Sequence, residues 1–165
     1  MKKLFLVRHS NTEKYSETNR DIDRKLTSEG MKIASLLGKY LKDEGVIPDA
    51  IISSSAQRAQ LTAELAATQL GFDIDNLQIV ESLYEASIRG FVEFLKNLYQ
   101  SYNTVLVVGH NPTITYVADF LSNVEISGMS PGAVVQINFE LDSWGLLDKG
   151  LGQFINYYDL PGETN

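Results

Sequence analysis

The sequence contains no cysteine and only two histidines. The absence of cysteine excludes a disulfide scaffold, a thiolate zinc site and a cysteine nucleophile, and it fits a reducing compartment. Any histidine chemistry must therefore use His9 and His110. Long apolar runs are also absent, because the run at 4–7 stops at Arg8. A secretory signal needs roughly 7–15 apolar residues and a membrane helix about 18. We therefore expect a cytoplasmic protein with no membrane segment.

Positive charge is also scarce. Lys and Arg number 14 against 21 Asp and Glu, which gives a net charge of −7. Nucleic-acid-binding proteins usually carry a basic face, so we expect no nucleic-acid partner. Hydrophobic residues make up 44% and charged residues 21%, which is typical of a folded chain and excludes disorder. The length of 165 residues predicts one domain over 1–165, with a core of its own.

The hydrophobic pattern alternates between strands and helices along the chain. Continuous or alternating apolar residues predict strands at 4–7, 50–52, 75–83, 104–108, 133–141 and 152–160. Apolar spacings of three and four predict helices at 28–43, from the serine run 53–55 to about 70, at 90–102 and at 112–121. Expected N-caps are Thr27 or Ser28, the serine run, and Asn111. This order predicts an α/β fold, a three-layer α/β/α sandwich whose central sheet is mostly parallel and ends in an antiparallel pair.

Both histidines lie just beyond the end of a predicted strand. His9 follows the strand at 4–7, and His110 follows the strand at 104–108. The serine run after the strand at 50–52 leads in the same way to Arg58. In open α/β sheets, ligands bind outside the carboxyl ends of the strands. We therefore expect Arg8, His9, Arg58 and His110 to converge on one site.

Four segments in this order resemble a known family. They read LVRHS around His9, DRKLTSEG around Arg24, SSSAQRAQLTA around Arg58 and VGHNP around His110. Together they resemble the histidine phosphatase superfamily, to which phosphoglycerate mutases and many phosphatases belong. The DRKLTSEG segment and the short chain are similar to the small branch typified by the SixA phosphohistidine phosphatases. The resemblance implies a phosphoglycerate mutase-like fold, and the absence of a long insertion disfavours a mutase.

The sequence departs from the family pattern at two positions. Ser10 stands where the family usually has Gly or Ala, a small change that still lets a phosphate group approach. Lys25 stands where Pro is usual, so the loop before the first predicted helix is expected to be less stiff and more positive.

The resemblance also implies a role for each residue of the site. His9 would be the nucleophile that carries a transient phosphohistidine, and His110 would assist and bind phosphate oxygens. Arg8 and Arg58 would grip the phosphate, for which planar guanidinium groups are suited. Glu85 is the candidate general acid. The expected rim of the site consists of Ser10, Asn11, Arg24 and Asn111. No metal or cofactor is expected.

We therefore expect a metal-independent phosphatase, and we favour phosphohistidine on a protein domain as its substrate, because a short chain with little lid leaves an open site. Two alternatives stay open, a phosphatase for small phosphate monoesters and a noncatalytic domain that binds phosphate or phosphoproteins. At the level of residues, Arg58 would alternatively pair with a carboxylate of its own helix. Glu85 would alternatively be a solvated loop carboxylate.

Overall fold

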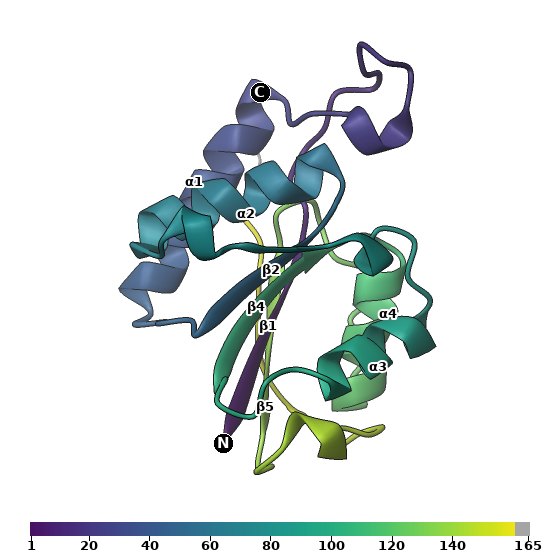
Figure 1. The fold of residues 1–165 in the computed structure, drawn as a ribbon. Helices are drawn as coiled ribbons and strands as arrows, with labels where there is room; N and C mark the ends of the chain where they lie inside the picture. Colours follow the sequence, from purple (N-terminus) through teal and green to yellow (C-terminus); the bar gives the residue numbers. More distant parts are fainter. Residues whose placement is uncertain (161–165) are drawn as a thin grey trace.

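The apolar strands pair into one six-stranded sheet in the computed structural model, which describes residues 1–160 (Figure 1). The strands are β1 (Lys2–Arg8), β2 (Ala50–Ser54), β3 (Gln78–Val80), β4 (Thr104–Gly109), β5 (Val134–Phe139) and β6 (Gln153–Tyr158). Their order in the sheet is β3-β2-β4-β1-β5-β6. The first four in this order run parallel, whereas β5 pairs antiparallel with both β1 and β6. The prediction of a mostly parallel sheet with a closing antiparallel pair is confirmed.

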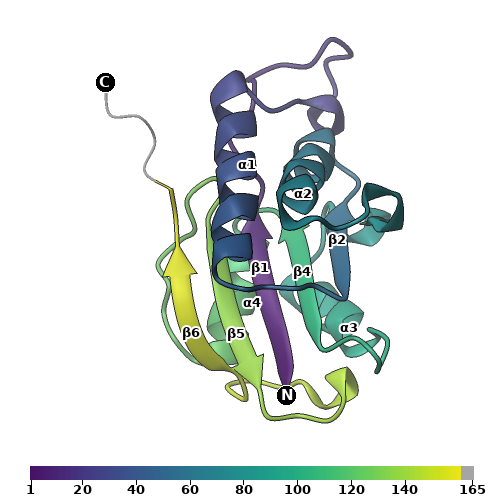
Figure 2. The ribbon, with the colours of Figure 1, turned by 90° about the vertical axis from the view of Figure 1, so that its left-hand side faces the viewer.

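Helices cover both faces of the sheet. They are α1 (Ser28–Asp43), α2 (Gln57–Leu70), α3 (Ile88–Lys96) and α4 (Thr113–Ser122). Figures 1 and 2 show α1 and α2 on one face and α3 and α4 on the other, so the predicted α/β/α sandwich is confirmed. Among residues 1–160, no helix combines the length and the apolar character that a membrane crossing requires.

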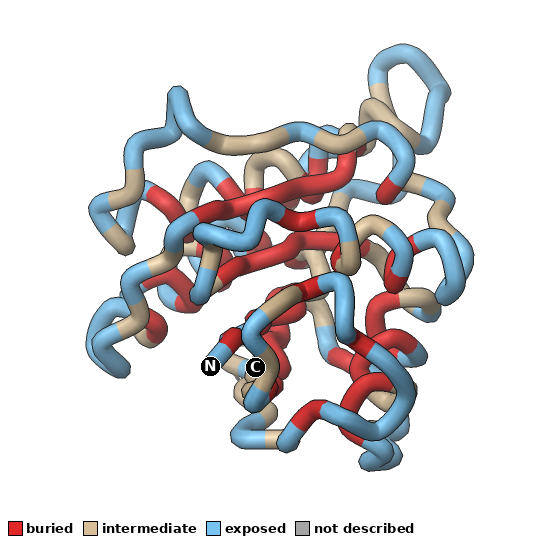
Figure 3. Tube along the Cα trace, turned by 60° about the horizontal axis from the view of Figure 1, so that its bottom comes forward, coloured by how far each residue is buried: buried red, intermediate tan, exposed pale blue. Residues whose placement is uncertain are grey.

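The central strands are buried on both faces, as the red segments in Figure 3 show. Successive residues of β1 point to opposite faces, as in any strand. Leu4 and Leu6 belong to the core under α3 and α4, whereas Phe5 and Val7 belong to the core under α1 and α2. A strand with apolar partners on both sides has a continuous apolar sequence, which explains why the run at 4–7 does not alternate.

Helix α1 begins, and helix α2 ends, where the sequence predicts. Thr27 is the N-cap of α1, and its side chain accepts a hydrogen bond from the backbone N–H of Gly30 at 3.0 Å. Gly71 follows α2 with a φ of 73°, in the left-handed region that glycine adopts without strain.

The prediction for the third helix is wrong at both ends, and the third strand is shorter than predicted. Helix α3 begins after Ser87, whose hydroxyl caps it, and it ends at Lys96 instead of continuing to residue 102. The ammonium group of the buried Lys2 donates hydrogen bonds to the carbonyls of Gln100 and Tyr102 at 2.6 and 2.9 Å, which holds that segment out of a helix. Of the strand expected at 75–83, only Gln78–Val80 is extended, between two short 3-10 turns.

Candidate active site

The ends of three neighbouring parallel strands bring the predicted site residues together. In the sheet β4 lies between β2 and β1, and Arg8 at the end of β1 is in register with Gly109 at the end of β4. The next residue in each chain segment is a histidine, and the ring centroids of His9 and His110 lie 5.1 Å apart. Ser54, the last residue of β2, reaches the same place. The sheet order therefore determines the centre of the site.

His9 is held by its own backbone neighbourhood. Its Nδ1 lies 2.8 Å from the carbonyl oxygen of Ser10. A carbonyl only accepts hydrogen bonds, so Nδ1 carries the proton and Nε2 presents a lone pair. Burial lowers the pKa of His9 to about 4, with further lowering by the Arg58 and Arg8 guanidinium groups and partial opposition from the Ser10 hydrogen bond. His9 is therefore neutral at pH 7, with an unprotonated Nε2.

His110 is held by Ser54, which the sequence analysis placed among helix caps. The Ser54 hydroxyl lies 2.5 Å from Nε2 of His110, and it also accepts the backbone N–H of Ala56 at 3.3 Å. Burial, with His9 and Arg58 nearby, lowers the pKa of His110 to about 3, so the ring is neutral. Within residues 1–160, the buried Nδ1 of His110 has no hydrogen-bond partner. A buried unpaired ring nitrogen beside a candidate nucleophile is a natural contact for a ligand oxygen.

Two arginines flank the histidines. Arg8 donates one hydrogen bond to the carbonyl of Met129 at 2.8 Å, and its buried Nε has no partner in the described part of the chain. Arg58, at the start of α2, has a side chain that is only 9% exposed. It pairs with Asp21 and not with a carboxylate of its own helix, so that alternative is wrong. Both guanidinium groups contribute to the lowered pKa of His9, which places positive charge around the ring.

Asp21 and Tyr84 also belong to the site, although the sequence analysis did not single them out. The carboxylate of Asp21 accepts hydrogen bonds from Arg58 and from the Tyr84 hydroxyl. The ring of Tyr84 lies edge-on to His110, with 5.6 Å between centroids, and 5.9 Å from the Arg58 guanidinium carbon. Only their positions in the sequence could have indicated them, because both lie close to predicted site residues. Asp21 lies three residues before Arg24, and Tyr84 directly precedes Glu85.

The starts of α2 and α4 differ from the predicted caps. The N-cap positions are Ala56 and Pro112, and neither side chain caps its helix. Asn111 instead donates to the Met129 carbonyl at 2.9 Å and accepts from Thr115 at 2.7 Å. Both helices follow strands that end at the site, and helix starts carry backbone donors and a positive dipole end. An anion next to the histidines would therefore meet favourable amide groups.

The remaining predicted residues lie around this centre at different depths. Glu85 is exposed and lines a cavity of about 230 Å³ together with His110 and Asn111. Arg24 donates to Asp21 and Thr12 from the loop that follows His9. Two other residues expected at the rim are fully or partly buried. Ser10 is fully buried, with its N–H on Thr62, and the Oδ1 of Asn11 is buried without a partner among residues 1–160.

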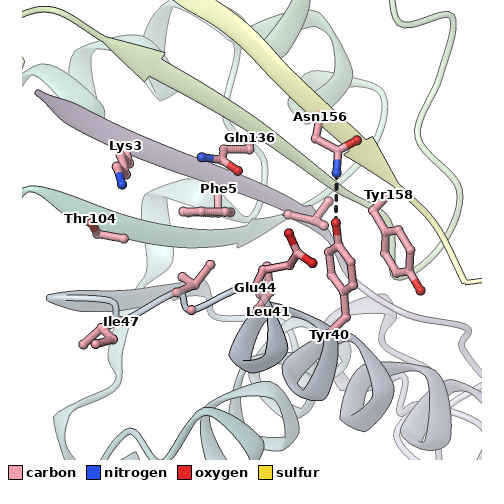
Figure 4. Close-up of a pocket in the computed structure, with 13 residues that line it drawn as sticks. Lys3, Phe5, Tyr40, Leu41, Glu44, Ile47, Thr104, Gln136, Asn156 and Tyr158 are labelled. Carbon is pink, nitrogen blue, oxygen red and sulfur yellow. Dashed lines mark hydrogen bonds between the residues drawn. The ribbon is translucent and has the colours of Figure 1, made fainter.

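A larger cavity, of about 290 Å³, lies elsewhere, between the end of α1 and the sheet (Figure 4). Its wall includes the stacked rings of Tyr40 and Tyr158, with centroids 3.6 Å apart, and Asn156 donates to the Tyr40 hydroxyl. Neither histidine nor either site arginine lines it. We therefore place the chemistry where the histidines and arginines meet, beside the smaller cavity that His110 lines.

Comparison with known proteins identifies the family to which the chain belongs. The sequence model of the histidine phosphatase superfamily (branch 1) matches residues 4–91. An uncharacterised protein of Mycobacterium tuberculosis is 31% identical over 140 residues, which cover 85% of this chain and 84% of that protein.

Solved structures share the fold. The protein histidine phosphatase SixA complexed with tungstate superimposes with a TM-score of 0.81 at 21% identity, covering 95% of this chain and 96% of that one. Phosphoserine phosphatase from Entamoeba histolytica, in complex with 3-phosphoglyceric acid, has a TM-score of 0.68 at 17% identity, covering 97% of this chain and 98% of that one.

Proposed function

Because the chain belongs to branch 1 of the histidine phosphatase superfamily and is a phosphatase, we propose that it transfers phosphate from its substrate to His9 and then to water. One observation carries this proposal. His9 is neutral, its Nδ1 is fixed on the Ser10 carbonyl, and it lies beside His110 and two arginines. A neutral imidazole surrounded by fixed positive charge is suited to attack a phosphorus atom.

The reaction has two steps. Nε2 of His9 attacks phosphorus, the bond from phosphorus to the leaving group breaks, and the leaving group takes up a proton. A water molecule then attacks the phosphorus of the phosphohistidine, the P–N bond breaks, and inorganic phosphate leaves while His9 recovers its neutral ring. Neither step needs a metal ion in this proposal, because the positive charge comes from the chain itself.

The phosphate oxygens are bound by three side chains and two helix starts. Arg8 and Arg58 supply charged donors, and the Nδ1–H of His110 supplies a neutral one. Backbone N–H groups at the starts of α2 and α4 add further donors. As bonds form and break, charge develops on these oxygens, and donors fixed in advance stabilise it.

The substrate we favour is phosphohistidine on a protein domain. The chain superimposes better on the protein histidine phosphatase SixA than on the phosphoserine phosphatase, with TM-scores of 0.81 and 0.68. Glu85 is exposed at the cavity beside His110, so the leaving-group side of the site is accessible from solvent. An open approach suits a histidine displayed on the surface of another protein.

The position of Glu85 favours a second candidate, a phosphatase for small phosphate monoesters. An alkoxide leaving group needs a proton at the moment the P–O bond breaks, and Glu85 lines the cavity that contains His110. A protonated imidazole leaves more readily and needs this acid less.

Turnover in the presence of a chelator tests the proposal. A phosphohistidine-bearing protein domain and an aryl phosphate serve as substrates, with the wild type and His9→Ala compared. We expect wild-type turnover that EDTA does not abolish, an acid-labile phosphoenzyme, and a loss of roughly a thousandfold or more in His9→Ala. An inert wild type whose phosphate affinity equals that of His9→Ala would instead identify a noncatalytic binding domain.

Replacing Glu85 separates the two substrate classes. In Glu85→Gln, we expect hydrolysis of an alkyl phosphate to fall by roughly 10²-fold, the usual contribution of a general acid, while phosphohistidine hydrolysis changes little. Glu81→Gln is the matched control, because Glu81 is an exposed carboxylate of the same segment that does not line the cavity. A sugar phosphate hydrolysed far faster than phosphohistidine would overturn our choice of substrate.

A further inference from the structure

Asp21 connects three segments of the chain at the edge of the site. It lies in the 3-10 turn Asp21–Asp23, the purple turn at the top of Figure 1. Its backbone carbonyl accepts a hydrogen bond from Nη1 of Arg58 at 2.8 Å. Its Oδ2 accepts a hydrogen bond from Nη2 of the same arginine at 3.0 Å. Oδ2 also accepts a hydrogen bond from the hydroxyl of Tyr84, and Oδ1 accepts one from Nη1 of Arg24. One residue therefore anchors a loop, a helix start and an aromatic ring.

These contacts fix the guanidinium of Arg58 before any substrate arrives. Two of its five N–H groups point at a single residue, and the Tyr84 ring lies beside the guanidinium carbon. The side chain is 9% exposed, so solvent offers it little alternative hydrogen bonding. When hydrogen bonds hold both terminal nitrogens of the guanidinium group, its plane is fixed. The fixed plane determines the direction of the remaining N–H groups. Hydrogen-bond donors that are oriented before the reaction stabilise the transition state more than donors that must become ordered during it.

The carboxylate of Asp21 is itself held, and it stays ionised. The hydrogen bond from Tyr84, joined by those from Arg24 and Arg58, keeps the pKa of Asp21 well below its usual range. Asp21 is therefore unsuited to be a general acid at neutral pH. A phosphate that displaced this carboxylate from Arg58 would also have to break the bonds to Tyr84 and Arg24, and it would not replace the bond from Arg58 to the Asp21 backbone. These contacts favour a fixed support over a competitor for the phosphate site.

We propose that Asp21 is a positioning residue that orients Arg58 toward the transferred phosphate and ties the loop after His9 to helix α2. The inference rests on the proposed function, in which Arg58 binds that phosphate. Asp21 acts through Arg58 and does not touch the reacting atoms. Tyr84 supports it by holding the same carboxylate oxygen.

The test compares Asp21→Ala, Asp21→Asn and Asp23→Ala with the wild type. Asp23 is the matched control, because it lies in the same turn and binds Arg20 and Thr18 instead of a site residue. We expect Asp21→Ala to lower kcat/KM for an aryl phosphate by roughly 10- to 100-fold, the size expected when a catalytic donor is displaced by about 1 Å. Asp21→Asn loses the charge and one acceptor atom but keeps one oxygen that accepts hydrogen bonds, so its loss should be smaller than that of Asp21→Ala. Asp23→Ala should stay within about twofold of the wild type.

A double-mutant cycle with Arg58→Ala separates positioning from a general structural effect. If Asp21 acts through Arg58, then Asp21→Ala should add almost nothing in the Arg58→Ala background. Full additivity would overturn the inference, and so would an Asp21→Ala enzyme that binds tungstate more tightly than the wild type, since that result identifies a competitor. If Asp21→Ala does not fold, the same cycle is run with Asp21→Asn. A wild type without turnover contradicts the proposed function, whereas an active wild type with unchanged Asp21 variants contradicts only this inference.

Discussion

At the scale of single residues, we infer that Ser54 selects which nitrogen of His110 carries a proton. The Ser54 hydroxyl already accepts the N–H of Ala56, so its own hydrogen is available to Nε2 of His110. With Nε2 accepting, a neutral His110 must carry its proton on Nδ1, the nitrogen that is buried without a partner in the described structure. The serine thus turns His110 into a donor toward the site.

Replacing Ser54 should therefore weaken catalysis through the wrong tautomer of His110. We expect Ser54→Ala to lower kcat/KM by roughly 10- to 100-fold, because a misassigned ring proton removes a hydrogen bond to the reacting group. Nitrogen-15 NMR of the His110 ring should show the tautomer shifting away from Nδ1–H. Ser53→Ala is the control, since that buried hydroxyl donates to the Ser54 carbonyl and not to a histidine. An unchanged ring spectrum in Ser54→Ala would contradict this account.

The sequence predicted which histidines and arginines meet, but it missed their supports. His9, His110 and Arg58 follow strand ends, and a strand end is visible in the apolar pattern. Asp21 reaches Arg58 across 37 positions and Tyr84 across 63, through side chains with no periodic pattern. Ser54 lies in a run of three serines, where helix capping was the simpler local interpretation. Contacts of this kind depend on the assembled sheet.

At the scale of elements, tertiary contacts decide where helices start and stop. Helix α1 follows its local sequence, with Thr27 as its cap, whereas α3 ends early and α4 starts without the predicted Asn111 cap. In both exceptions a distant group competes for the polar atoms. Lys2 donates to the carbonyl of Gln100. The side-chain amide of Asn111 donates to the Met129 carbonyl and accepts from the Thr115 hydroxyl, so it does not cap the helix. Local propensity is accurate only where no such competitor is present.

Lys2 should consequently be important for stability despite its position at the start of the chain. Its side chain is 3% exposed, and its ammonium group donates to Gln100, Tyr102 and Asn103. We expect Lys2→Met to lower the free energy of unfolding by about 2–4 kcal/mol, because the backbone carbonyls of Gln100 and Tyr102 and the side-chain oxygen of Asn103 lose a charged donor. Lys3→Met, at an exposed neighbouring position, should cost less than about 1 kcal/mol. Urea denaturation measures both, and equal losses would show that Lys2 has no special role.

At the scale of the whole molecule, the sheet order joins segments that the sequence can only place in a row. The antiparallel pair β5–β6 was predictable from alternation, but the insertion of β5 beside β1 was not. Because β1 is buried, its backbone N–H and C=O groups need partners on both edges, and β4 and β5 supply them. The same arrangement places β1 next to β4, and the histidines that follow these strands are half-buried there.

Burying two neutral histidines gives the folded protein a characteristic response to acid. The pKa of His9 falls from 6.5 to about 4 on folding, and that of His110 falls to about 3. Between pH 6.5 and pH 4 the unfolded chain therefore binds protons that the folded chain does not, so the free energy of unfolding decreases as the pH falls. Above pH 6.5 neither state is protonated at these positions, and the histidines impose no penalty. One pKa unit corresponds to about 1.36 kcal/mol, so His9 accounts for at most about 3 kcal/mol at pH 4.

Comparing the wild type with His9→Gln isolates this effect from the carboxylates, which titrate in both proteins. Glutamine is neutral at every pH, so His9→Gln should lose less stability than the wild type when the pH is lowered from 7 to 4.5. Urea unfolding at the two pH values measures the difference, which should amount to about 1–3 kcal/mol. Parallel losses in the two proteins would mean that His9 titrates alike in the folded and unfolded chains. In that case the pKa of His9 in the folded protein would be the ordinary one, and the lowering attributed to its burial would have to be abandoned.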